Sequence, residues 1–172
     1  DLAAAIVERV RSYAKGTRSE RVSSEVSELV NKAVREFKRQ SGERVEVWVP
    51  QEQPVYIIVN PLEFELVIIN LLRNAAQALQ ELGVLNPKVA LTIKREDNKA
   101  LIAIEDNGHI EKEKIEKLSE PTNSTKADGL GLGLQIVRSI IENHGGKIFF
   151  SQAAAGGLRV EIRLPAEETT EQ

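Results

Sequence analysis

The sequence predicts an α/β two-layer sandwich, in which about three helices cover one face of a mixed, mostly antiparallel sheet. Apolar residues recur at the helical spacing of three and four positions over residues 26–37 and 62–79. Alternating segments flank polar or small-residue turns at 96–99 and 153–157, which is typical of hairpins. The 172 residues are enough for one full core, so we expect one globular domain with a short appendage.

The first predicted helix of the domain has a single apolar face. This face consists of Val26, Leu29, Val30, Ala33, Val34 and Phe37. Ser23 or Ser24 is expected to cap its first turn. Two strands are predicted to follow, over residues 44–49 and 55–59, with Trp48 on or near the core.

The second predicted helix begins with a complete start signal. Asn60 is expected to cap it, Pro61 fits the first turn, and Glu63 stands where a capping-box carboxylate reaches back to the cap. Its apolar residues continue to Leu79, and Gly83 is expected to end it.

A long irregular stretch follows the first hairpin. Residues 106–133 are polar and contain glycine, and only a short helix is expected there, near 112–118. Loops of this length inside a compact domain are usually functional or disordered. The next helix is predicted over 132–144, with Gly145 and Gly146 as its end.

The N-terminal residues 1–15 place apolar side chains at helical spacing and predict an amphipathic helix. A hinge is expected at 16–21, because that stretch has no periodicity. These patterns divide the chain into an appended helix (1–18), a globular domain (19–166) and a solvated tail (167–172). Because the chain lacks methionine even at position 1, we expect it to be a fragment of a longer protein.

Composition excludes several classes of function. The formal charge of −3 gives no basic surface for nucleic acid or for an anionic membrane. The absence of cysteine excludes disulfides, thiolate metal sites and cysteine nucleophiles. No apolar run reaches the roughly 18 to 20 residues of a spanning helix.

Two asparagines in the second predicted helix are the first candidate ligands. Asn70 and Asn74 are four positions apart, so both amides project from one face of the helix. Each could instead brace neighbouring backbone, but a pair favours a ligand. An amide oxygen is a hard donor that suits Mg²⁺ beside nucleotide phosphates, and Asn74 is the predicted ligand.

A second signal is the run Asp106-Asn107-Gly108 at the end of a predicted strand. By itself this run is also typical of an ordinary turn. As part of a site, a buried carboxylate accepts a hydrogen bond from an exocyclic amino group, and Gly108 leaves room for a purine ring.

The third signal is a glycine repeat, 129–134, that runs directly into a helix, with Lys126 just before it. Alternating glycines at a helix start expose backbone N–H groups beside the positive end of the helix dipole, which suits a polyphosphate. The repeat does not follow a strand, so neither the dinucleotide-fold fingerprint nor the Walker loop applies.

Together these segments resemble the motifs of the histidine-kinase-type ATPase superfamily, which includes gyrase, chaperone and mismatch-repair ATPases. Within it the chain is most similar to bacterial two-component sensor histidine kinases. Residues 70–75 look like the asparagine box, 106–108 like the first glycine box and 129–134 like the second. The N-terminal pattern at 1–15 is similar to the second helix of the dimerisation and phosphoacceptor hairpin that precedes this domain in those kinases.

The resemblance implies a Bergerat-type ATP-binding fold, with ATP and Mg²⁺ as ligands. The implied ATP-binding residues are Asn70, Asn74, Gln77, Asp106, Gly108, Lys126, Gly129, Gly131, Leu132 and Gly133. Asn74 would hold Mg²⁺, Asp106 would bind the adenine amino group, and residues near 109–130 would form a lid over the phosphates.

Two departures from the family pattern concern that lid. His109-Ile110 replaces the usual Pro-Gly pair, and polar residues at 119–123 replace the phenylalanines of the aromatic box. Each buried phenylalanine would contribute about 1.5–3 kcal/mol, so we expect a loosely held lid. The other histidine, His144, is interpreted as a cap at a helix terminus.

The resemblance also implies a reaction and its partners. In the family, the γ-phosphoryl group of ATP passes to a histidine of the dimerisation helix and then to a response regulator. That histidine would lie upstream of Asp1, so the fragment should bind nucleotide without phosphorylating itself. The expected location is the cytoplasm, including the cytoplasmic part of a membrane-anchored sensor. The alternatives are a degenerate docking or dimerisation module, a stand-alone ATPase of the superfamily, and an anti-sigma-factor kinase.

Overall fold

The structure is a computed structural model that describes residues 20–50, 53–120 and 131–168. Its main sheet has five strands in the order β2-β4-β5-β7-β6. They are β2 (Glu46–Trp48), β4 (Lys88–Glu96), β5 (Lys99–Asp106), β6 (Lys147–Gln152) and β7 (Leu158–Pro165). Only the β2–β4 pair is parallel among these, so the predicted mixed, mostly antiparallel sheet is confirmed.

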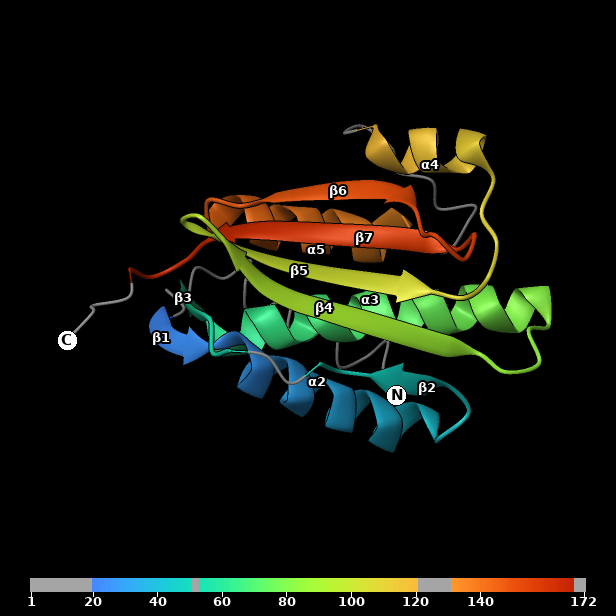
Figure 1. The fold of residues 1–172 in the computed structure, drawn as a ribbon, viewed down its shortest axis with the longest axis horizontal. Coiled ribbons are helices and arrows are strands. Elements are labelled where there is room, and N and C mark those ends of the chain that lie inside the picture. Colours follow the sequence, from blue (N-terminus) through green and yellow to red (C-terminus); the bar gives the residue numbers. More distant parts are fainter. Residues whose placement is uncertain (1–19, 51–52, 121–130, 169–172) are drawn as a thin grey trace.

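Three helices cover one face of this sheet, as the sequence predicts (Figure 1). They are α2 (Val26–Ser41), α3 (Pro61–Leu82) and α5 (Gly131–Asn143). A fourth helix, α4 (Lys112–Ser119), lies beside the edge strand β6 (Figure 1). The core lies between the three helices and the inner face of the sheet, and α3 occupies its centre between α2 and α5.

A small second sheet was not predicted in full. It pairs β1 (Val22–Glu25) with β3 (Tyr56–Val59), and only the second of these strands was expected. The assignment of Ser23 or Ser24 as the cap of α2 was wrong, because residues 22–25 use their backbone to pair with β3. Glu25 occupies the cap position, and its side chain makes no capping hydrogen bond.

The start of α3 confirms the predicted cap. The Asn60 side chain accepts a hydrogen bond from the Glu63 N–H at 3.1 Å. Glu63 does not reach back as a capping box requires, because the Asn60 N–H donates to Nε2 of His144 at 3.2 Å. At the other end of the helix Gly83 adopts the left-handed conformation, with φ 66°.

Trp48 does not belong to the core. It is 60% exposed, because β2 is an edge strand and Trp48 points to the face of the sheet that the helices leave open. Its neighbour Val47 packs against the core instead. Within the described part of the chain, no helix is long and apolar enough to cross a membrane.

Candidate functional site

The two candidate asparagines lie on α3, the central helix. Asn70 is 2% exposed, and the structure gives neither its amide nitrogen nor that of Asn74 a hydrogen-bond partner, although both nitrogens are buried. A buried polar group without a partner costs about 1–3 kcal/mol, and few survive in a folded protein without a reason. These two amides therefore point to a polar ligand.

The predicted carboxylate, Asp106, ends β5 and is 7% exposed. Its Oδ1 accepts a hydrogen bond from the Gly108 N–H at 2.9 Å. Burial raises the pKa of Asp106 above its ordinary value, and the backbone N–H groups of Gly108 and Leu158, which donate to the carboxylate, oppose that rise. Two backbone donors thus hold the carboxylate in place and leave it acceptor capacity for a ligand.

Two glycines allow the backbone to approach this carboxylate. A Cβ at Gly108 would lie 3.1 Å from Asp106 Oδ1 and equally near the Leu79 and Leu82 side chains of α3. A Cβ at Gly157 would lie only 2.2 Å from both the carbonyl oxygen and Oδ1 of Asp106. Gly157 was not predicted as a site residue, because the Gly156-Gly157 pair by itself indicates only a turn and carries no sign of its closeness to Asp106.

The turn between β6 and β7 is fastened to the loop after Asp106. The Ile110 N–H donates to the Gly156 carbonyl at 3.1 Å. The Gln152 side chain donates to the carbonyls of Ile110 and Gly156, each at 3.2 Å. The turn therefore forms one wall of the Asp106 corner, which the sequence did not lead us to expect.

The other end of the site lies where α5 begins. A Cβ at Gly133 would lie 3.7 Å from Oδ1 of Asn70, so the start of α5 and the asparagine face of α3 adjoin. At about 1.5 Å per residue, Asn70 and Leu79 are roughly 13 Å apart along α3. The site is therefore elongated, with the carboxylate corner at the C-terminal end of α3 and the asparagines at its middle.

For the remaining predicted ATP-binding residues, the structure shows fewer contacts or none. Gln77 is exposed on α3, and its side chain donates to Glu81 at 3.2 Å. Gly131 and Leu132 begin α5, and the structure does not describe their side chains. Lys126 and Gly129 lie outside the described residues.

Asn107, which lies between Asp106 and Gly108 in the chain, has a structural role. Its Oδ1 accepts from the Lys88 N–H at 2.8 Å, and its Nδ2 donates to the Asn86 carbonyl at 2.8 Å. Asn107 thereby braces the start of β4. The Asp-Asn-Gly run is thus a braced turn and a carboxylate site at once.

Comparisons with known proteins identify the family to which the chain belongs. The family described as histidine kinase-, DNA gyrase B- and HSP90-like ATPase matches residues 59–168. Sensor protein TdiS of Thauera aromatica is 32% identical over 174 residues, which cover 96% of this chain and 31% of TdiS. Sporulation kinase B of Bacillus subtilis is 34% identical over 125 residues, which cover 72% of this chain and 28% of that kinase.

A solved histidine kinase domain has a similar fold. The catalytic domain of histidine kinase ThkA is similar with a TM-score of 0.70 at 27% identity, and the match covers 85% of this chain and 95% of that domain. The chain spans 31% of the length of TdiS and 25% of the C4-dicarboxylate transport sensor protein DctS of Rhodobacter capsulatus, so it corresponds to one part of such proteins. Because the family match covers more than half of the chain and includes every predicted site residue, this chain belongs to the histidine kinase-, DNA gyrase B- and HSP90-like ATPase family, with sensor histidine kinases among its relatives.

Proposed function

We propose that this chain is the catalytic domain of a sensor histidine kinase, which binds ATP and passes its γ-phosphoryl group to a histidine outside the chain. The observation that carries the proposal is the elongated site along α3. It has a buried carboxylate at one end and two buried amide nitrogens without partners at the other. An adenine nucleotide has matching chemistry, with an amino group on its base and phosphates at its far end.

The base would bind at the Asp106 corner. The ionised carboxylate would accept a hydrogen bond from the exocyclic amino group of adenine, while the backbone N–H groups of Gly108 and Leu158 keep it oriented. A side chain at Gly108 would crowd Leu79 and Leu82, each 3.1 Å from its Cβ, so glycine keeps this corner unobstructed, and the exposed Leu82 would contact the ring. A base with a carbonyl at that position would meet acceptor against acceptor, so we expect discrimination in favour of adenine.

The phosphates would lie toward the start of α5. Backbone N–H groups at Gly129, Gly131, Leu132 and Gly133 would face them at the positive end of the helix dipole, and Lys126 would add a charge. The described residues contain no group of three or more His, Cys, Asp or Glu that could hold a metal. The unpartnered amide nitrogens would donate to phosphate oxygens, and the amide oxygens of the same side chains suit a hard cation that keeps water and phosphate ligands.

Asn74 would therefore hold Mg²⁺ through its amide oxygen, with Asn70 beside it and Gln77 one turn farther along α3. When bound, the ion would neutralise charge on the transferring phosphoryl group. The contribution of the chain itself is to hold the nucleotide in one orientation, which is how such sites accelerate transfer.

Neither histidine of the chain is suited to receive the phosphoryl group. His144 has a side chain that is 2% exposed, and both ring nitrogens are hydrogen-bonded. His109 is exposed, but its Nε2 lies 3.3 Å from the Glu111 carboxylate, so this ring nitrogen is already engaged in a contact within the loop. The acceptor would be a histidine of a dimerisation hairpin in the parent protein, and a response regulator would take the group from it in the cytoplasm.

Labelled phosphate tests this function. With γ-labelled ATP and Mg²⁺, the chain alone should retain no covalent label. A polypeptide carrying the phosphoacceptor hairpin of a sensor kinase should acquire label that is lost in acid, as expected of phosphohistidine. Label retained on this chain, or none on the hairpin at saturating ATP, would contradict the proposal.

A further inference from the structure

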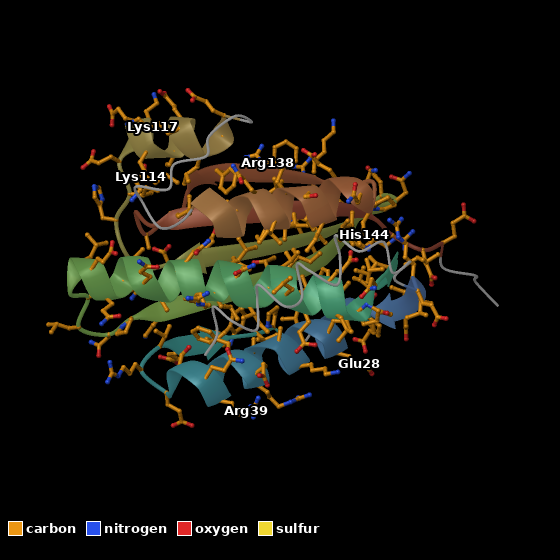
Figure 2. The ribbon with its side chains drawn as sticks, turned by 180° about the vertical axis from the view of Figure 1, so that it is seen from behind. Glu28, Arg39, Lys114, Lys117, Arg138 and His144 are labelled. Carbon is orange, nitrogen blue, oxygen red and sulfur yellow. The ribbon has the colours of Figure 1, made fainter. Side chains whose placement is uncertain are left out.

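His144 is a buried titratable group that the proposed reaction does not use. It follows the last residue of α5 (Figure 2). Its side chain is 2% exposed. Its Nδ1 lies 2.7 Å from the carbonyl oxygen of Ile140, and its Nε2 lies 3.2 Å from the backbone nitrogen of Asn60. The carbonyl must accept and the N–H must donate, so the ring is neutral with its proton on Nδ1.

These two hydrogen bonds join the ends of the two helices that line the site. Ile140 belongs to α5, whereas Asn60 is the cap of α3. Figure 2 shows His144 at the end of α5 where α3 begins, so the two helices run antiparallel. The second ring nitrogen thus turns an ordinary helix-end cap into a link between helices.

The same two helices also meet at the phosphate end of the site. There Gly133 lies beside Asn70, since a Cβ on this glycine would be 3.7 Å from the Asn70 Oδ1. From Asn60 to Asn70 along α3, and from Gly133 to His144 along α5, the distance is roughly 15 Å in each case. Two contacts at opposite ends of one antiparallel pair therefore fix how far α5 can slide along α3.

Apolar packing defines that sliding position less sharply than a hydrogen bond does. The surface between the two contacts is apolar, with Val67 and Val137 fully buried, and apolar burial is not directional. A hydrogen bond has a preferred length and angle, so the Asn60–His144 bond selects one register. The turn after His144 packs closely against β7, since a Cβ at Gly146 would lie 2.5 Å from the Arg163 carbonyl.

We infer that His144 is a positioning residue for the nucleotide site: through the Asn60 N–H it sets the register of α5 on α3, and so holds Gly133 beside Asn70. The inference rests on the proposed function, because the ligand that benefits is the nucleotide phosphate. It assigns His144 a role beyond that of a helix cap.

Two amide substitutions at His144 test the contributions of its two ring nitrogens one at a time. In His144→Gln the side-chain oxygen can reach the position of Nε2 and accept from Asn60, whereas in His144→Asn the amide can replace only Nδ1. His144→Asn should bind Mg-ATP about threefold to tenfold more weakly, the worth of one hydrogen bond expressed as an affinity ratio. His144→Gln should keep the affinity of the unmodified chain.

A control separates positioning from general stability. Ile93→Val removes one buried carbon on β4, which is separated from β6 and its neighbour α5 by two strands. It should lower the melting temperature and leave the affinity unchanged when all chains are titrated well below their melting temperatures. If His144→Asn binds as tightly as the unmodified chain, the inference is wrong and the proposed function still stands. If the unmodified chain binds no nucleotide, both fail.

A measurement on the unmodified chain decides the matter if His144→Asn does not fold. Coupling is reciprocal, so a link that favours nucleotide binding must itself be strengthened by the nucleotide. Hydrogen exchange of the Asn60 N–H should slow when Mg-ADP is added. The Gly42 N–H at the end of α2 serves as the reference and should not change. Equal responses of the two amides would overturn the inference.

Discussion

Gly157 provides the strongest single perturbation of the site, because the structure leaves no room for any side chain there. Alanine at this position would place its Cβ 2.2 Å from two Asp106 oxygens, whereas Cβ contacts under 3.0 Å essentially never occur. One of these oxygens belongs to the backbone of β5, which pairs with β4 at Val89, so the β6–β7 turn has to move. The required shift is at least the difference of 0.8 Å between 3.0 and 2.2 Å.

That shift breaks contacts that can be named. The Ala153 N–H donates to the Gly157 carbonyl at 2.7 Å, and the Leu158 N–H donates to the Asp106 carboxylate. Overpacking of this kind costs about 1–3 kcal/mol. A hydrogen bond lost from a charged group costs a further ~1.5–3 kcal/mol, and part of this loss falls on Asp106, the carboxylate of the proposed adenine site. Gly157→Ala should therefore weaken ADP binding by about tenfold or more.

Calorimetric titration with ADP measures the affinity, and urea unfolding of the same sample measures the stability. Ala154→Ser, an exposed residue in the same turn, is the matched control and should change neither quantity. If Gly157→Ala keeps both its ADP affinity and its unfolding midpoint, the described approach of the turn to Asp106 is wrong.

Three further predictions concern the two ends of the site. Asn74→Ala removes a buried amide nitrogen without a partner, so the free energy of unfolding should stay the same or rise. ATP titrations with and without Mg²⁺ should show that the ion no longer strengthens binding, so that the affinity for Mg-ATP falls about tenfold or more. In Gly133→Ala the new Cβ makes only an ordinary contact with Asn70, so the free energy of unfolding should rise by about 0.5–1 kcal/mol while triphosphate binding weakens. A gain in both stability and triphosphate affinity would contradict the placement of phosphate at the start of α5. Burial raises the pKa of Asp106, so on acidification the carboxylate takes up its proton at a pH above the ordinary aspartate pKa of about 3.9. Adenine affinity should therefore begin to fall before the pH reaches that ordinary pKa. Acidification has the opposite effect on folding: because the folded state binds this proton more tightly than the unfolded chain, the contribution of Asp106 to stability grows as the pH falls. In Asp106→Asn, the affinity for ADP should no longer depend on pH in this way.

The sequence contained enough information for most of the fold. Helix α3 has its cap, its apolar face and its terminal glycine all within one stretch, and each of these local signals was confirmed. The two hairpins of the main sheet were likewise found from alternation and turn residues. Strand β1 was missed, because its serines resemble a helix cap and only its partner β3, some 30 residues later, makes it a strand.

The arrangement of the candidate site was predictable where its residues lie within a short motif. Asp106, Gly108 and the two asparagines lie within such motifs, and the structure places Asn70 beside Gly133 and Gly108 beside Asp106. Gly157 was out of reach, because its closeness to Asp106 depends on the β5–β7 pairing and not on any local pattern. His144 was identified as a helix-end cap, but its link to Asn60 spans 84 positions and required the three-dimensional structure.

Titration of Mg-ADP and Mg-ATP into the unmodified chain and into Asp106→Asn tests most directly whether adenine binds at the buried carboxylate. We expect saturable binding of both nucleotides by the unmodified chain, reduced about tenfold to a hundredfold in Asp106→Asn, which loses a charged acceptor. Equal affinity in the two chains would show that adenine does not bind at this carboxylate. No binding by the unmodified chain would contradict the central claim and indicate a member of the family that has kept the fold as a docking module.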